Sequence, residues 1–241
     1  MAGHSHAHNV MFKKGANDAK KAKIFTKIAR DIQVAAKSGS TDPDLNSKLK
    51  ILISKARSLN MPNEKIASAI EKGNKDTTNY ENVRYNVFFD HGISLIIECL
   101  TDNKNRSASD IRSVLNKFDA QLTQTGSVEF MYSHIGRVIY STDVCTEDKF
   151  LEIAIEAGAD NFYVDEDIFI VETKIENMLL VAKEITEKLG QEPKSAEWFW
   201  KANEYITITD NNLLEKLKKL LDELDDLDDV KEIYTNADVD F

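Results

Sequence analysis

Residues 161–172 read NFYVDEDIFIVE, and this stretch decides the fold of the second half of the chain. Its pattern predicts two short strands, 161–165 and 167–172, that follow each other directly. The elements predicted around it are, in chain order, strand 135–141, helix 147–158, helix 175–189 and strand 194–201. The resulting order β-α-β-β-α-β predicts a ferredoxin-like domain.

The beginning of the chain is predicted to be helical. Over 17–38, apolar residues recur at spacings of three and four, as on the inner face of a helix, and Gly39 ends the pattern. A second helix over 44–59 is broken by Asn60-Met61-Pro62, whose proline fits the first turn of a third helix that Gly73 closes. These elements predict a three-helix domain.

The middle of the chain predicts a hairpin of strands 83–89 and 93–100, then a helix over 105–118. The last predicted elements are strand 205–209, helix 211–225 and strand 230–236. They have no sheet of their own, so we expect them to return and pair with the hairpin. The sequence therefore predicts an α+β chain of four parts: a basic tail (1–16), a helical domain (17–78), a discontinuous α/β domain (79–133 plus 203–241) and an inserted ferredoxin-like domain (134–202).

Charge is distributed unevenly along the chain. Residues 1–80 hold 15 Lys or Arg and 7 Asp or Glu, a balance of +8, whereas residues 81–241 have a balance of −18, which gives the total of −10. A basic beginning on an acidic remainder indicates a protein that meets a polyanion with one end.

Composition excludes several other classes. Cys99 and Cys145 lie far apart in or beside apolar runs, which favours two free buried thiols in a reducing compartment. No apolar stretch approaches 18 residues and the start has no hydrophobic signal core, so we expect a cytoplasmic protein without a membrane partner.

Six short motifs along the chain resemble those of the YebC family. They are MAGHS (1–5), KIFTK (23–27), NMP (60–62), LTDNKNRSAS (100–109), TGSV (125–128) and YTNAD (234–238). Each motif is weakly specific, but six in the same order over the whole chain make a strong resemblance. The chain departs from the family at His6 and Ala7, at Met11-Phe12 and at Phe89-Asp90-His91-Gly92, where the family is more basic, more polar or richer in glycine.

The resemblance implies a helical domain followed by two α/β domains, one inserted in the other. The family is described as probable transcriptional regulatory proteins that bind DNA. Its members, among them the mitochondrial translational activator of cytochrome c oxidase, are also linked to translation on the ribosome through proline-rich stretches. Both descriptions imply a nucleic-acid partner, DNA or ribosomal RNA, and no chemical reaction.

The main candidate for binding is a basic stripe on the first helix. At 100° per residue, its cations fall opposite the apolar seam, where Lys and Arg would neutralise phosphates. The cations of this stripe are Lys20, Lys23, Lys27, Arg30 and Lys37, and Lys13, Lys14 and Lys21 are further candidates beside it. A solvated helix face is the alternative interpretation.

Three loops are further candidates for contact. Lys104 and Arg106, with Asn103 and Asn105, stand before a helix, where they fit either a phosphate contact or ordinary capping by Ser107 or Asn105. Gly126-Ser127 is either a contact loop or a tight turn before a strand at Glu129. Met61 and Pro62 form the third candidate loop.

Other chemistries find little support in the sequence. His4, His6 and His8 alternate, but nothing fixes them in the geometry that a metal requires, so we expect no metal. Phosphate-binding glycine loops and nucleophile elbows are missing, so we expect no enzyme activity, cofactor or small-molecule substrate. Trp198, Phe199 and Trp200 lie on a predicted strand whose alternation would bury either both tryptophans or the phenylalanine, and a stacking platform for bases is the minority interpretation.

Overall fold

The computed structural model describes residues 18–75 and 78–238, with side chains from Lys21 onward. These residues form two compact units. The first unit comprises residues 18–23, 78–133 and 200–238, and the second comprises 24–75 and 134–199. None of the helices described is long and apolar enough to cross a membrane.

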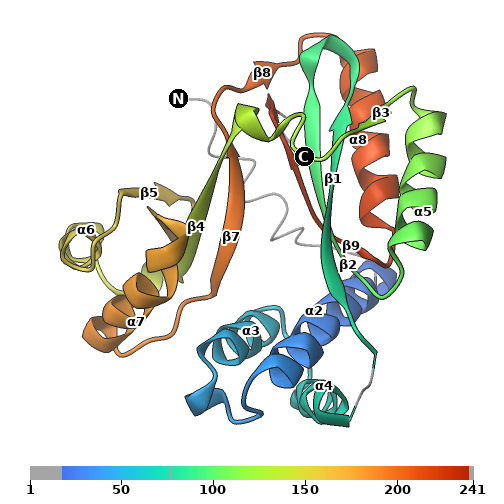
Figure 1. The fold of residues 1–241 in the computed structure, drawn as a ribbon. Helices are drawn as coiled ribbons and strands as arrows, with labels where there is room; N and C mark the ends of the chain where they lie inside the picture. The colour runs from blue at the N-terminus through green and yellow to red at the C-terminus, as the bar shows by residue number, and fades with distance from the viewer. Residues whose placement is uncertain (1–17, 76–77, 239–241) are drawn as a thin grey trace. The chain divides into compact units, whose positions relative to one another are not determined.

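The first unit is built on an antiparallel sheet in the order β3-β1-β2-β9 (Figure 1). Its strands are β1 (Glu81–Phe88), β2 (Ser94–Thr101), β3 (Gln121–Thr123) and β9 (Val230–Thr235). Strand β9 comes from the C-terminal end of the chain and pairs with β2, with Thr235 opposite Leu95. The chain therefore leaves this unit and returns to it, as the predicted α+β fold requires.

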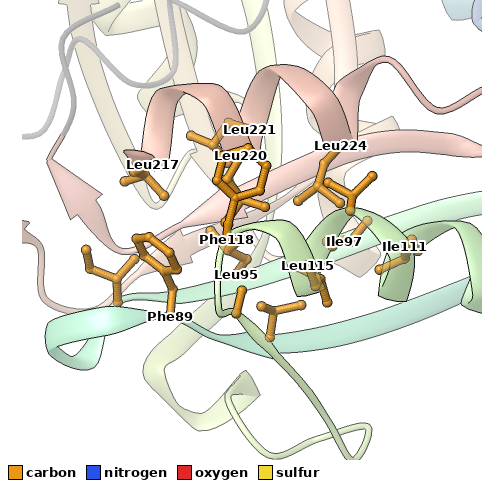
Figure 2. Packing of buried hydrophobic residues seen from close by; sticks show 14 of the residues in the cluster. Phe89, Leu95, Ile97, Ile111, Leu115, Phe118, Leu217, Leu220, Leu221 and Leu224 are labelled. Carbon is orange, nitrogen blue, oxygen red and sulfur yellow. The ribbon is translucent and has the colours of Figure 1, made fainter. Parts of the chain in front are cut away.

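Helices α5 (Lys104–Lys117) and α8 (Asn211–Asp225) pack on one face of this sheet. Alternation along β2 points Leu95 and Ile97 at the helices, which contribute Ile111 and Leu115 from α5 (Figure 2). Helix α8 adds the buried leucines Leu217, Leu220, Leu221 and Leu224. Each fully buried side chain of this kind stabilises the unit by about 1.5–3 kcal/mol.

Two predictions for the first unit are wrong. The strand expected over 205–209 does not join the hairpin sheet: β8 (Ile206–Thr207) pairs in parallel with β10 (Ala237–Asp238), because β9 already occupies the free edge of β2. The strand expected at Glu129 is a 3-10 turn over Glu129–Met131. The Met131 N–H donates a hydrogen bond to Val128 O, as in a 3-10 turn.

The ferredoxin-like part has the sheet order β5-β6-β4-β7. Its elements are β4 (Tyr132–Ser141), α6 (Glu147–Glu156), β5 (Asn161–Asp165), β6 (Ile168–Thr173), α7 (Met178–Leu189) and β7 (Ser195–Ala202). Tyr140, Phe150 and Phe169 are buried in the core, where the Phe150 and Phe169 ring centroids lie 4.4 Å apart. The predicted β-α-β-β-α-β order is confirmed.

The helical part of the second unit contains α2 (Asp18–Ser38), a 3-10 turn (Pro43–Leu45), α3 (Ser47–Ser58) and α4 (Asn63–Lys75). Ile28 and Ile32 of α2, Leu49 and Ile53 of α3 and Ile66 of α4 share one core. Asn46 joins two of the helices. Its Oδ1 caps α3 by accepting from Leu49 N–H, while its Nδ2 donates to Ala35 O near the end of α2.

The glycines of the helical part are needed for close packing. A Cβ on Gly73 would lie 2.4 Å from Gln33 O, so this glycine marks the crossing of α4 and α2, and α4 continues beyond it to Lys75. A Cβ on Gly39 would lie 2.8 Å from Asn46 Nδ2. The prediction that Gly73 closes its helix is therefore wrong, because a short-range pattern does not show which helix crosses there.

Both cysteines are free, as predicted. Cys99 is buried in the core of the first unit, but Cys145 is only partly buried, just before α6. Burial raises the pKa of the Cys145 thiol, and Lys149 opposes that shift.

Candidate nucleic-acid interface

The basic stripe of α2 lies outside the apolar seam of that helix. Ile28 and Ile32 are buried, whereas the described cations of the stripe are exposed (Lys37) or partly exposed (Lys23, Lys27, Arg30), and the neighbouring candidate Lys21 is exposed. Lys13, Lys14 and the side chain of Lys20 lie outside the described residues, as do His4, His6 and His8. The structure thus places the described part of the predicted stripe on the surface.

Helix α4 adds cations that the sequence analysis did not select. Lys65 and Lys72 are exposed and lie seven residues apart, which puts them on one face of the helix after two turns. Lys65 Nζ lies 5.4 Å from the centroid of the Phe25 ring on α2. Both helices therefore carry cations outside the buried core, and we call the cations of these two helices the basic surface below.

Lys23 of α2 forms an ion pair with an acidic residue of α8's C-terminal end. Its Nζ lies 2.8 Å from Asp226 Oδ1 and 3.3 Å from Asp226 O, at the C-terminal end of α8. Both side chains are about half exposed, so the pair is weak and open to competition by a phosphate.

Two cations of α3 form ion pairs with glutamates of the ferredoxin-like part. Lys55 Nζ lies 2.9 Å from Glu197 Oε2, and Arg137 Nη2 lies 2.7 Å from Glu197 Oε1. Burial alone would raise the pKa of the Glu197 carboxyl, but Lys55 and Arg137 hold this pKa well below its usual range. Lys50 pairs with Glu192 at 2.8 Å.

The loop before α5 is fixed by internal contacts. Asn103 caps the helix by accepting from the N–H groups of Asn105 and Arg106, so the predicted capping by Ser107 or Asn105 is wrong. The Ser107 hydroxyl instead donates to Asp229. An asparagine side chain two or three residues ahead of free N–H groups has the better geometry for a cap.

Both cations of this loop have carboxylate partners. Arg106 Nη2 lies 2.7 Å from Asp102 Oδ1 and 2.7 Å from Asp229 Oδ2, and Lys104 Nζ lies 2.5 Å from Glu81 Oε2. Burial would raise the pKa of Asp229, but hydrogen bonds from Arg106, Ser107 and Thr101 lower this pKa below its ordinary value. The geometry favours the capping interpretation over the phosphate contact.

The Asn60-Met61-Pro62 loop ends α3. Asn60 has a left-handed backbone (φ 60°), its N–H donates to Arg57 O, and Met61 N–H donates to Ala56 O. This pattern is a Schellman motif, which asparagine tolerates at the left-handed position. Met61 is buried in the helical core, and Pro62 O accepts the first bonds of α4, from Lys65 and Ile66.

Gly126 and Ser127 lie in a turn that the sheet holds in place. Gly126 has φ 91° and donates its N–H to Asn86 Oδ1 of β1, and the Ser127 hydroxyl bonds to that of Thr123. Gly126 itself is exposed. The predicted tight turn is present, and it precedes the 3-10 turn described above.

The three aromatic residues of β7 have different environments. Phe199 and Trp200 are buried, whereas the Trp198 side chain is 48% exposed, so both burial patterns predicted from alternation are wrong. The Arg137 guanidinium carbon lies 3.8 Å from the Phe199 ring centroid, and Trp200 Nε1–H donates to Glu98. Neighbouring rings thus pack against separate partners that lie far away in the sequence.

Comparison with known proteins agrees with this architecture. The model of the TACO1/YebC protein N-terminal domain matches residues 5–76, and that of the TACO1/YebC second and third domain matches residues 80–237. The chain belongs to the TACO1/YebC family. A probable transcriptional regulatory protein of Rickettsia bellii is 42% identical over 241 residues, covering 99% of this chain and 94% of the relative. One of Finegoldia magna is 40% identical over 240 residues and 99% of both chains.

The fold is shared with a solved structure of similar length. The crystal structure of a conserved hypothetical protein from Aquifex aeolicus has a TM-score of 0.81 and 33% identity, covering 95% of this chain and 94% of that one. Within this TACO1/YebC chain, two of the motifs that carried the resemblance have structural roles of their own. NMP is the Schellman turn, and TDNKNRS is the capped start of α5 with its Asp229 network.

Proposed function

We propose that this protein is a nucleic-acid-binding regulatory factor of gene expression, without catalytic activity, that acts in the cytoplasm. The observation that carries the proposal is the basic surface of α2 and α4, whose cations lie outside the apolar core of the helices. The relatives' name, probable transcriptional regulatory protein, supports the regulatory role.

The charge distribution explains how such a protein would bind. Lysines on a helix face neutralise phosphates and release counterions, so affinity falls steeply with salt. Residues 81–241 carry a balance of −18, which repels the same polyanion and leaves the helical part as the end that approaches. Flexible lysines on a helix face bind phosphates and read little sequence.

Two nucleic-acid partners are consistent with this surface. Duplex DNA would fit the name of the relatives. Ribosomal RNA would fit a surface that reads little sequence, because the ribosome supplies its own geometry and the protein needs few base contacts. An effect on the translation of proline-rich stretches is the functional form of this second candidate.

A charge-reversal variant tests the proposal. Lys20→Glu, Lys23→Glu, Lys27→Glu and Arg30→Glu together should abolish binding to salt-washed ribosomes and to mixed-sequence duplex DNA. They should also flatten the slope of log affinity against log salt by about three to four. The control carries four reversals at exposed lysines elsewhere: Lys149→Glu, Lys174→Glu, Lys183→Glu and Lys219→Glu.

The two variants have the same net charge, so they separate a local surface from overall repulsion. The proposal is overturned if the α2 variant and the control variant lose binding equally, or if the α2 variant loses no binding. Co-sedimentation with ribosomes that persists at moderate salt favours translation, whereas recovery of particular genomic duplex fragments favours transcription.

A further inference from the structure

The Trp198 indole is an exposed aromatic ring on a rigid support. Strand β7 lies at one edge of the ferredoxin-like sheet, and Trp198 is 48% exposed although its neighbour Phe199 is buried. The His134 ring meets the indole edge-on, with centroids 6.4 Å apart and planes at 78°. The strand and this contact limit the orientations of the ring.

One cation of α3 lies beside this ring. Lys48 Nζ lies 5.8 Å from the Trp198 ring centroid. The position of α3 beside β7 is fixed by the Lys55–Glu197 ion pair, and by the Ser54 hydroxyl, which donates to Pro193 O at 2.7 Å. Helix α3 holds Lys48, Lys50, Lys55 and Arg57 and no acidic residue.

Two of these four cations are exposed and, in the described part of the chain, are not used in ion pairs. Glu192 and Glu197 pair with Lys50 and Lys55, but among the residues described Lys48 and Arg57 are exposed and form no ion pair. The ring is thus bordered by a cation and an imidazole, which is a poor match for the apolar pocket of a protein partner. An aromatic face beside lysines is instead the combination that binds unpaired nucleotides, through base stacking and phosphate contact.

We propose that Trp198 is a stacking platform for an unpaired nucleobase, and that Lys48 contacts the neighbouring phosphate. This proposal rests on the nucleic-acid-binding function above and names its target as single-stranded or looped nucleic acid. An exposed cation–π contact is weaker than base stacking, so a base displaces Lys48 from the ring and leaves its ammonium free to reach the phosphate.

Affinity for two oligonucleotides tests the proposal. The probes are an oligouridine of about twelve nucleotides, a length within the range that one stacking domain spans, and a fully paired duplex of equal charge. Trp198→Ala should weaken oligouridine binding about tenfold and duplex binding less than twofold. Trp198→Phe should keep most of the affinity, and Leu180→Ala, at an exposed apolar residue of α7, is the matched control.

Fluorescence gives a second readout. The chain has two tryptophans, so Trp200→Phe leaves Trp198 as the single emitter. Oligouridine should quench this emission and protect it from acrylamide. Melting curves of the Trp198 variants should match the wild type, since half of the side chain is already in solvent.

The outcomes separate this proposal from the proposed function. If the charge-reversal variant of α2 loses binding but Trp198→Ala binds oligouridine normally without quenching, the stacking platform is wrong and the basic surface stands. If neither variant changes binding to any probe, the proposed function fails as well. Equal losses for oligouridine and duplex in Trp198→Ala would also overturn the platform, because stacking requires an unpaired base.

Discussion

The basic residues of this protein occupy two kinds of environment. Lys104 and Arg106 lie beside Glu81, Asp102 and Asp229, which hold them in the first unit. The described cations of α2 and α4 are exposed or partly exposed and lie outside the buried core of the helices. The comparison teaches that a cluster of cations in a sequence can hold the fold together or lie on an exposed helix face, and that its place in the fold decides which.

Helix α3 belongs to both groups. Its Lys50 and Lys55 pair with Glu192 and Glu197, like the cations of the α5 loop. Among the residues described, Lys48 and Arg57 are exposed and form no ion pair. The following variants therefore compare residues that hold the structure together with residues that are available to a partner.

The largest expected effect on stability is at Asp229. Its Oδ2 accepts hydrogen bonds from Thr101, Ser107 and Arg106, so Asp229→Ala should destabilise the first unit by about 2–4 kcal/mol. Urea unfolding followed by circular dichroism measures the change. Asp102→Asn, at an exposed partner of Arg106, is the control and should cost less than about 1 kcal/mol.

Binding by the Asp229 variant decides whether the two groups of cations are distinct. Below its unfolding transition, Asp229→Ala should bind ribosomes or duplex DNA as the wild type does. A large loss of affinity in the folded variant would show that the α5 loop itself contacts the partner.

The next effect concerns the framework under the basic surface. Gly73→Ala places a methyl group 2.4 Å from Gln33 O, and relief of this overlap separates α4 from α2. The expected cost is about 2–3 kcal/mol in the stability of the helical part, measured by hydrogen exchange of α2 and α4 amides. Ser68→Ala, at an exposed residue of the same helix, should leave exchange unchanged or slower.

Much of the fold could be predicted from the sequence because its signals are local. The spacing of apolar residues indicated α2, α3, α5 and α8, and the order of elements indicated the ferredoxin-like part and its insertion. The short strands β3, β8 and β10 have two or three residues each, too few for alternation to show. Gly73 was misinterpreted because a helix end and a helix crossing both favour glycine.

The candidate site could be predicted only in part. The stripe of α2 follows from one helix alone, so its surface position could be foreseen. The partners of Arg106 and Lys55 are Asp229 and Glu197, which lie 123 and 142 residues away. The exposure of Trp198 and its approach to Lys48 are long-range features of the same kind, so the sequence showed the residues and not their environment.

A smaller effect is expected at Asn46, which connects α2 and α3. Asn46→Ala loses the cap of α3 and both Nδ2 donations, to Ala35 O and Ser40 O, and should cost about 2 kcal/mol. Asn46→Asp keeps the capping oxygen and loses the two donations, so it should cost about 1 kcal/mol. Equal stability of the two variants in thermal melts would show that the cap contributes nothing and that only the two Nδ2 donations stabilise the contact.

The smallest effect is the pH dependence of the contact that holds α3. Lys55 and Arg137 lower the pKa of Glu197 in the folded protein, so the contact contributes fully above the unfolded pKa of a glutamate. Its contribution is lost as pH falls toward the folded pKa, by about 1 kcal/mol between pH 7 and about pH 3.5. Glu197→Gln removes this titration, so the difference in unfolding free energy between these two pH values should shrink by that amount. Glu192→Gln, which removes the exposed partner of Lys50, should keep the wild-type difference. An unchanged pH dependence in Glu197→Gln would place the acid sensitivity in other carboxylates and leave α3 held by Ser54 and its apolar contacts.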